Sequence, residues 1–360
     1  MPSRNLCGVL RSADVAADTS PMDLTVHLDA VSHRFGEVQA LDELCFSAPT
    51  AKITVLLGPN GAGKTTTIRA ITGAIAPLHG TVRTFGLDPA PESNNVRIRC
   101  GVVSAKPALY DRLSGHDNLL YSAQLYEVDP DVTEARIIEC ATRFGIQDAL
   151  EHQVGGYSTG MKTRLALSRS LLHDPDLLLF DEPTSGLDPE SSQAVLDLIR
   201  ELTNEGKTVV MCTHLLSEAE GLADHVVIME SGRSLVEGES EALMKKFWPT
   251  PTFRIAATVP DQLDRLVHLP GVLGINRLED AQVFVDHLGR IPALVAHLAA
   301  DGVQITRVEP HEPTLEDLYF AARTGAGLLD NPLHPHSATQ FQPGGSEVAT
   351  HPTTTVGANS

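Results

Sequence analysis

The sequence has few basic side chains, few cysteines and no long apolar run, and each shortage excludes a class of protein. Lys and Arg number 27 against 46 Asp and Glu, which gives a net charge of −19. Such an acidic balance excludes general nucleic-acid binding, because that binding depends on neutralising phosphates with Lys and Arg. The five cysteines are scattered and odd in number, without a C-x-x-C pair, which is typical of reduced thiols in a cytosolic protein.

No apolar run approaches the roughly 18 to 20 residues that a bilayer-spanning helix needs. The first residues of the chain carry acidic side chains where a signal peptide would have an apolar core. The hydrophobic fraction of 42% is nevertheless sufficient for a packed core. We therefore expect an acidic globular protein of the cytosol, and any membrane role must come through a partner.

Composition shifts divide the chain into four parts. Residues 1–23 are polar and small, and predict a flexible N-terminal extension. Across residues 24–246, apolar runs of strand length alternate with helix-period segments, which predicts an α/β sheet. Pro249 and Pro251 then exclude a helix and mark a boundary. From residue 324 to residue 360, Gly, Pro, Ser, Thr and His dominate without periodicity, and this tail is predicted to be disordered.

A small accessory, regulatory domain is predicted between that boundary and the tail, over residues 252–323. Its expected elements are a strand, a helix, two strands paired as a hairpin, a helix and a strand, at residues 252–259, 262–268, 272–278, 281–286, 291–300 and 303–308. This β-α-β-β-α-β order is typical of the ferredoxin-like α+β fold.

The strongest motif follows an apolar, strand-like run at residues 53–57. The residues that match the phosphate-loop pattern G-x-x-x-x-G-K-[ST] are Gly58, Pro59, Asn60, Gly61, Ala62, Gly63, Lys64 and Thr65, and Thr66 continues into a helix pattern. Glycines let backbone N–H groups turn toward phosphates, and the helix N-terminus adds its dipole. We expect all nine residues to bind a nucleotide, with Lys64 on the β- and γ-phosphates and the Thr65 hydroxyl on Mg²⁺. A glycine turn without a ligand is the alternative.

Two further apolar runs end in polar side chains that could serve this loop. Asp181 and Glu182 follow the run at residues 177–180 and are expected at the carboxyl end of a buried strand, which is the ligand edge of an open α/β sheet. Asp181 is placed to hold Mg²⁺, through water, and Glu182 to act as general base on the attacking water. His214 ends the run at residues 209–212 and is expected at the same edge, in reach of the γ-phosphate.

With these motifs in this order, the chain resembles the ATP-binding subunit of an ABC transporter. The decisive stretch is YSTGMKTRLALSRSLLHDPDLLLFDEPTSGLD, which matches the family's signature loop, its helix, the Walker B strand and the D-loop without gaps. The resemblance covers residues 26–238. It implies a P-loop NTPase of ABC type, with a RecA-like core and a helical subdomain, that hydrolyses ATP with Mg²⁺.

The resemblance also implies that ATP is sandwiched between two such subunits, expected to be a homodimer. It assigns further nucleotide-binding residues by position: Phe35 on the adenine, Asp188 in the D-loop, and the signature loop, with Ser158, Thr159, Gly160 and Met161 facing the partner's phosphate loop. For Phe35, a core position near a strand end is the alternative.

Two positions depart from the family pattern. In the signature loop, Thr159 replaces a flexible glycine, while Ser158 and Gly160 are kept, so binding is expected to survive. In GVVSAKPALY, Ala105 stands where the family has a glutamine that reaches toward Mg²⁺ and the lytic water. Alanine can do neither. Partial substitution by the neighbouring Lys106 is the alternative, although it brings a positive charge where the glutamine is neutral.

The stretch VEPHEPTLEDLYFAART, residues 308–324, resembles the closing motif of exporter ATPases of the daunorubicin-resistance type. This likeness implies a subunit at the cytoplasmic face of the cell membrane. There it would power a separately encoded integral membrane permease that exports a drug, lipid or natural product.

Three other functions compete with export. A chromosome or DNA-repair ATPase would have a long coiled coil between the phosphate loop and the acidic pair, but Lys64 and Asp181 are only 117 residues apart, without sustained heptads. A translation factor with two cassettes would need a second phosphate loop. A slow-hydrolysing regulatory ABC ATPase that is not coupled to transport stays open, because of Ala105.

Overall fold

The computed structural model describes residues 24–277 and 281–325, which form two units. Among these residues, the first unit comprises 24–249 together with 312–325, and the second comprises 250–311. The predicted N-terminal extension, residues 1–23, lies outside the described residues, and so does the predicted tail from residue 326 onward.

A six-stranded sheet forms the centre of the first unit. Its strands, in spatial order, are β5 (Cys100–Val103), β6 (Leu177–Asp181), β7 (Thr208–Thr213), β3 (Ile53–Leu57), β8 (His225–Glu230) and β9 (Arg233–Glu239). All neighbours are parallel except β8 and β9. Every residue of β3, β6 and β7 is buried, as expected for parallel strands covered on both faces. The polar residues at their carboxyl ends therefore share one edge.

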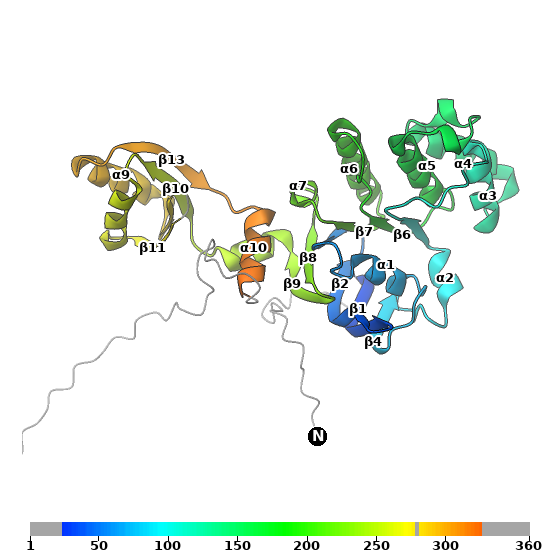
Figure 1. Cartoon of the computed structure of the whole chain (residues 1–360), viewed down its shortest axis with the longest axis horizontal. Coiled ribbons are helices and arrows are strands. Elements are labelled where there is room, and N and C mark those ends of the chain that lie inside the picture. Colours follow the sequence, from blue (N-terminus) through cyan, green and yellow to red (C-terminus); the bar gives the residue numbers. More distant parts are fainter. Residues whose placement is uncertain (1–23, 278–280, 326–360) are drawn as a thin grey trace, which may run out of the picture. The chain divides into compact units, whose positions relative to one another are not determined.

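A second, antiparallel sheet packs against this centre. Its order is β2 (Val38–Pro49), β1 (Leu24–Phe35) and β4 (His79–Thr84). One hydrophobic core joins Leu28 and Phe46 of this sheet to Ile71 of α1 (Lys64–Ile71) and to Val210 of the central sheet. Figure 1 shows β1, β2 and β4 together beside α1. This packing holds the turn between β1 and β2 next to the start of α1.

The helices between β5 and β6 form a separate group, which we call the helical subdomain: α3 (Gly115–Leu125), α4 (Pro130–Arg143), η2 (Gln147–Ala149), η3 (Val154–Gly156) and α5 (Thr159–Leu171). The first and third long helices begin at serine caps: Ser114 accepts from the Asp117 N–H at 2.9 Å, and Ser158 from the Met161 N–H at 3.2 Å. The first unit also contains α2 (Ser93–Arg97), α6 (Pro189–Asn204), α7 (Leu216–Ala219) and α8 (Ser240–Phe247), besides a last helix described below.

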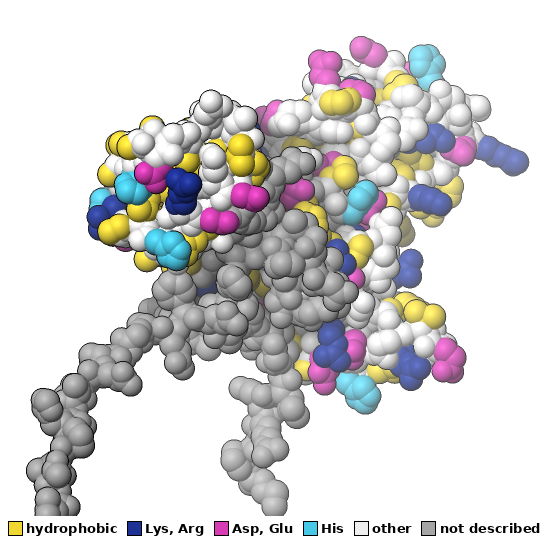
Figure 2. Space-filling model, turned by 60° about the vertical axis from the view of Figure 1, so that its left-hand side comes forward, with side chains coloured by type: hydrophobic (Ala, Val, Ile, Leu, Met, Phe, Trp, Pro, Cys, Tyr) yellow, Lys and Arg dark blue, Asp and Glu magenta, His cyan; other side chains and the backbone are white. Residues whose placement is uncertain are grey.

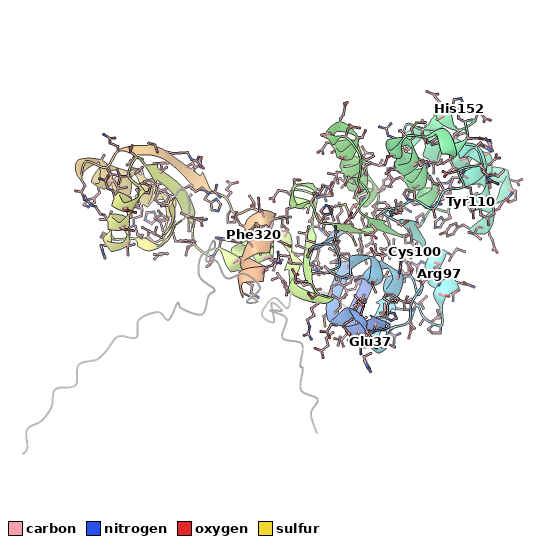
Figure 3. The ribbon with its side chains drawn as sticks, in the orientation of Figure 1. Glu37, Arg97, Cys100, Tyr110, His152 and Phe320 are labelled. Atoms are coloured by element: carbon pink, nitrogen blue, oxygen red, sulfur yellow. The ribbon has the colours of Figure 1, made fainter. Side chains whose placement is uncertain are left out.

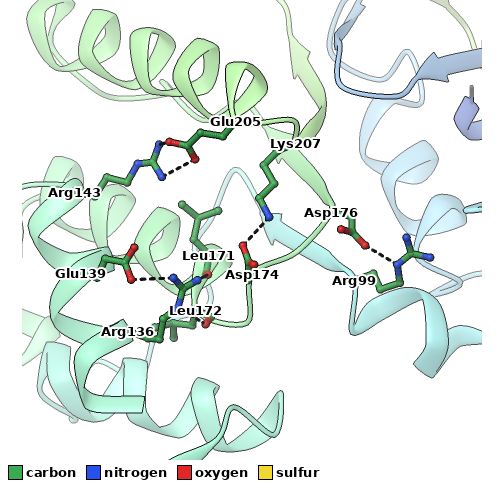
Figure 4. A network of polar contacts seen from close by, with 10 residues as sticks. All are labelled: Arg99, Arg136, Glu139, Arg143, Leu171, Leu172, Asp174, Asp176, Glu205 and Lys207. Carbon is green, nitrogen blue, oxygen red and sulfur yellow. Dashed lines mark hydrogen bonds and ion pairs between the residues drawn. The ribbon is translucent and has the colours of Figure 1, made fainter. Parts of the chain in front are cut away.

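Arginine side chains of α4 connect the helical subdomain to the end of α6 and join helices within it (Figure 4). Arg143 of α4 binds both carboxylate oxygens of Glu205, at 2.7 and 3.1 Å, beyond the end of α6. Arg136 donates to the carbonyl oxygens of Leu171 and Leu172 at the end of α5, and so joins α4 to α5 within the subdomain. A forked guanidinium pair has a defined geometry, so the Arg143–Glu205 contact orients the subdomain against the end of α6.

The second unit contains the elements β10 (Thr252–Ala257), η4 (Pro260–His268), β11 (Val272–Arg277), β12 (Ala281–Val285), η5 (Leu288–Arg290), α9 (Ile291–Ala300) and β13 (Ile305–His311). Its antiparallel sheet has the order β11-β12-β10-β13. Leucines of η4 and α9, such as Leu266 and Leu298, pack on Phe253 and Val283. The helix expected at 262–268 is a 3₁₀ helix that begins at Pro260, and the last strand runs to His311 rather than ending at residue 308.

Helix α10 (Leu315–Gly325) belongs to the first unit, which corrects the expected accessory domain of 252–323. A reciprocal cap starts the helix, because the Thr314 N–H donates to Asp317 Oδ2 at 2.9 Å and the Asp317 N–H to Thr314 Oγ1 at 3.2 Å. The Leu315 N–H donates to Glu220 Oε2 at 2.7 Å, after α7. Figure 3 shows α10 with Phe320 labelled. The helix also continues past residue 324, where the tail was expected to begin.

The other end of α10 is held by an ion pair, and its removal should destabilise the first unit. Arg323 Nε lies 3.0 Å from Glu230 Oε2, and the two side chains are only 23% and 17% exposed. We expect Arg323→Ala to lower the free energy of unfolding by about 1–3 kcal/mol, because Glu230 stays behind without its cation. This value lies between the effects of breaking an exposed ion pair and a buried one. The measurement is the urea midpoint of the full chain.

The matched control is Lys245→Ala, whose partner Glu241 and own side chain are 90% and 81% exposed. That variant should unfold at the wild-type midpoint, since exposed pairs contribute little. Equal midpoints for both variants would show that α10 is not held by this pair.

Candidate functional site

The loop between β3 and α1 has a backbone shape that only glycine allows. Gly61 and Gly63 have φ values of 86° and 104°, in the left-handed region. A Cβ on Gly63 would lie 2.7 Å from the Ala40 carbonyl oxygen, and one on Gly58 would lie 2.4 Å from the Met229 carbonyl oxygen. Both are impossible contacts, so packing requires a glycine at positions 58 and 63, whereas Gly61, where a Cβ would meet nothing within 4 Å, is required by conformation alone.

Lys64 folds back over this loop. Its Nζ donates to the carbonyl oxygens of Gly58, at 2.7 Å, and Pro59, at 3.2 Å, and lies 3.9 Å from Glu182 Oε1. The lysine is 6% exposed. A buried ammonium needs such partners, and its charge is therefore held at the centre of the loop, between the backbone amides and the acidic pair.

Thr65 and Asp181 meet across the sheet edge. The Thr65 hydroxyl donates to Asp181 Oδ2 at 2.6 Å. Burial raises the pKa of the Asp181 carboxyl, and the hydrogen bond from Thr65 opposes that rise. One hydroxyl and one carboxylate fit Mg²⁺, which is usually bound through one or two carboxylates together with substrate phosphates and water. Within the described part of the chain, no group of three or more His, Cys, Asp or Glu could hold a metal by itself.

Glu182 and His214 form a second pair at this edge. His214 Nδ1 lies 3.0 Å from Glu182 Oε1, and the Glu182 N–H donates to the Cys212 carbonyl oxygen at 2.9 Å. Glu182 has a φ of 53°, which is strained for a residue with a side chain. The surrounding structure must hold that conformation, and it turns the carboxylate toward the loop.

Most of these groups line a pocket of about 440 Å³, although Gly58, Pro59 and His214 are not part of its wall. Its wall consists of Val38, Gln39, Ala40, Asn60, Gly61, Ala62, Gly63, Lys64, Thr65, Thr66, Ala105, Asp181 and Glu182. The predicted phosphate loop and acidic pair are thus brought together, and Ala105 lies in the same wall. Sequence reasoning missed residues 38–40, because the start of β2 carries no motif.

The remaining predicted site residues are placed elsewhere. Phe35 is 45% exposed and lies edge-on to His33, with ring centroids 4.7 Å apart, three residues before the wall at Val38. The signature loop, residues 158–161, and Asp188 are also not part of this wall. Asp188 caps α6 by accepting from the Ser191 N–H at 2.9 Å and hydroxyl at 2.7 Å, and these bonds lower the pKa of its carboxyl.

Glu218 is a second residue that the motifs did not reveal. It is 8% exposed, and both of its carboxylate oxygens accept hydrogen bonds from threonines beside the acidic pair and His214. The only signal in the sequence is a glutamate four residues after His214, and this spacing matches none of the motifs described above.

Comparisons with known proteins agree with this geometry. A family model described as "ABC transporter" matches residues 41–185. The daunorubicin resistance ATP-binding protein DrrA3 of Streptomyces coeruleorubidus is 33% identical over 305 residues, which cover 83% of this chain and 95% of that protein. The bacitracin transport ATP-binding protein BcrA of Bacillus licheniformis is 31% identical over 86% of this chain and 100% of its own length.

Solved structures give the same result for the fold. An ATP-binding subunit of an ABC transporter is 27% identical and has a TM-score of 0.58, over 62% of this chain and 93% of its own. A dimeric ATP-binding cassette in a post-hydrolysis state, bound to ADP and phosphate, has a TM-score of 0.55 at 24% identity, over 59% and 98% of the two chains. The predicted P-loop NTPase fold of ABC type is confirmed.

The place of Ala105 in the pocket wall makes its role testable. We expect Ala105→Gln to raise the basal rate of phosphate release at saturating Mg·ATP, by up to about tenfold, because a polar group beside the lytic water contributes to its activation. The control is Lys106→Gln, which adds an amide to the neighbouring residue outside the wall. A rate equal to wild type, or slower, would show that this loop has a mechanical role.

Proposed function

The chain belongs to the ABC transporter family, and we propose that its ATP hydrolysis drives a separately encoded integral membrane permease in export. The chain is an ATPase with the fold of that family. The observation that carries the proposal is the pocket in which the phosphate loop and the Thr65–Asp181 pair meet Glu182, whose carboxylate contacts His214 outside the pocket wall. Relatives named for daunorubicin resistance and bacitracin transport match more than four fifths of the chain. We infer from them a drug, lipid or natural product as cargo.

In the proposed mechanism, the amides of the phosphate loop bind the phosphates and Lys64 balances their charge. Thr65 and Asp181 would hold Mg²⁺, which supplies further charge neutralisation at the β- and γ-phosphates. The Glu182 carboxylate takes a proton from the attacking water. His214, which is held by Glu182 at 3.0 Å, orients the carboxylate and contacts the γ-phosphate.

A homodimer would complete the site. Residues 158–161 and Asp188 do not reach the pocket of their own chain, and the chain has one phosphate loop. Two copies arranged head to tail would place the N-terminus of α5, capped by Ser158, against the phosphates bound by the other copy. This arrangement gives each signature loop a ligand.

The permease is proposed to dock on the helical subdomain and the loop before it. Tyr110 and Tyr121 are 51% and 47% exposed and lie edge to face, with ring centroids 5.3 Å apart, and Leu125 is 68% exposed. Figure 3 shows Tyr110 beside these helices. Exposed apolar groups of this kind are typical of protein interfaces. Tyr110 lies five residues after Ala105, so the same loop reaches both the pocket and the proposed interface.

Such a partner would place the protein at the cytoplasmic face of the cell membrane. Among the described residues, no helix has the length and apolar character to cross a bilayer. On the face drawn in Figure 2, acidic, basic and hydrophobic side chains are interspersed. The proposed docking surface is therefore defined by the apolar side chains around Tyr110 and not by charge.

The second unit is proposed to be an accessory, regulatory domain of ferredoxin-like type. Its support is the antiparallel order β11-β12-β10-β13 with η4 and α9 packed on the sheet. After β13 the chain returns to the first unit through α10, whose first N–H binds Glu220 beside α7. A signal from this domain could therefore reach the segment that follows His214.

The second candidate function is a slow-hydrolysing regulatory ATPase without a transport partner. It is favoured by Ala105 in the pocket wall, where the family has glutamine. Phosphate release measured with and without a candidate permease separates the two. Stimulation by the permease supports export, and an equal, slow rate in both supports the regulatory function.

Replacing the proposed general base should trap the nucleotide. We expect Glu182→Gln to bind ATP while its hydrolysis falls about 100-fold or more, because an amide cannot take the proton. The variant should accumulate as an ATP-bound dimer, measured by light scattering after size exclusion in saturating Mg·ATP. Glu190→Gln, an exposed glutamate of α6 outside the pocket wall, is the control and should hydrolyse ATP normally. A monomer in saturating ATP would count against the sandwich.

Changing the proposed docking surface should uncouple the ATPase from its permease. We expect Leu125→Ser to remove most of the increase in hydrolysis that the permease causes, because a polar group interrupts the apolar contact. The control is Leu78→Ser, a 56% exposed leucine that lies before β4. If the two variants respond equally to the permease, the docking surface lies elsewhere.

A further inference from the structure

Glu218 is a buried carboxylate whose two oxygens have separate partners. The Thr213 hydroxyl donates to Oε2 at 2.7 Å, and the Thr184 hydroxyl donates to Oε1. Glu218, Thr184 and Thr213 are 8%, 5% and 1% exposed. Hydrogen bonds to a carboxylate are strong away from water. This three-residue cluster therefore joins the segment after β6 to the end of β7 and to α7.

The two threonines flank the residues proposed to activate water. Thr184 follows Glu182 by two residues, and Thr213 immediately precedes His214. The Thr213 hydroxyl oxygen also accepts from the Leu215 N–H at 3.0 Å, which fixes the backbone on the far side of His214. Glu182 and His214 are therefore linked twice. Their side chains lie 3.0 Å apart, and Glu218 also joins the segment that follows Glu182 to the residue that precedes His214.

We propose that Glu218 is a positioning residue, which sets the distance and orientation between Glu182 and His214. Two observations show that this pair needs external support. Glu182 has the strained φ of 53°, which persists only where neighbours enforce it. The His214 side chain is 41% exposed, so packing restrains it little. The inference requires the ATPase reaction, but it does not depend on the permease or on the cargo.

The first test separates positioning from nucleotide binding. Thr184→Val and Thr213→Val each remove one hydroxyl at nearly constant volume, and Glu218→Gln leaves one threonine without an acceptor. We expect kcat to fall about 10- to 100-fold in each, as for small displacements of reacting groups. The dissociation constant of a fluorescent ATP analogue should stay within about twofold, since the phosphate loop is untouched. All measurements use the full chain, with thermal melting as the check on folding.

Matched variants control for the loss of a buried hydroxyl. Thr203→Val removes a hydroxyl that is 7% exposed and donates to the Ile199 carbonyl oxygen at 3.0 Å within α6. It should keep the wild-type kcat. Thr184→Ser and Thr213→Ser retain the donor and should restore most of the rate, which a role in packing alone would not predict.

A double-mutant cycle decides whether Glu218 acts through His214. If it does, Glu218→Gln should change the single-turnover rate of His214→Ala by less than about twofold, because the orientation it supports is already lost. Independent, multiplying losses would overturn the proposal. So would a wild-type kcat in the folded valine variants, or a loss of ATP affinity as large as the loss of kcat. If Glu218→Gln does not fold, the valine variants are combined with His214→Ala instead.

Discussion

The site depends on three buried parallel strands that end together. β3, β7 and β6 are neighbours, and their register places Leu57 opposite Thr213 and Asp181 opposite Cys212. Glu182 and His214 directly follow the ends of β6 and β7, and Lys64 follows the end of β3 after the phosphate loop. Because the strands are buried on both faces, a shift of one strand would expose apolar side chains and is disfavoured. The positions of the reacting groups are therefore determined by the core.

Two features of that arrangement are unfavourable by themselves and need support from neighbouring groups. The ammonium of Lys64 is removed from water, and it is stabilised by the carbonyl oxygens of its own loop. Glu182 has a left-handed backbone, which is held by the bond from its N–H to Cys212 and, we infer, by the contact of Thr184 with Glu218. Strain of this kind is common where a side chain must point at a reacting group. Stability of the core thus supports the geometry of the pocket.

The pocket is also linked to surfaces that a partner could reach. The segment between β5 and α3 carries Ala105 in the pocket wall and Tyr110 at the exposed face. On the other side, α7 carries Glu218 toward the reacting pair, and Glu220 just after it binds the start of α10. Two short segments therefore connect the reacting groups to the proposed permease surface and to α10.

The sequence by itself determined the phosphate loop, the acidic pair, His214 and the α/β fold. It could do so because each feature is local: a glycine pattern between strand and helix, or polar residues at the end of an apolar run. The strand order of the second unit was also largely predictable from alternation. The end of that unit was not, since the amphipathic pattern of α10 is the same whichever unit it packs on. Only the tertiary structure brought residues 38–40 into the wall that contains Ala105 and closed Glu218 on Thr184 and Thr213, because such contacts join side chains from separate elements and leave no period or spacing along the chain.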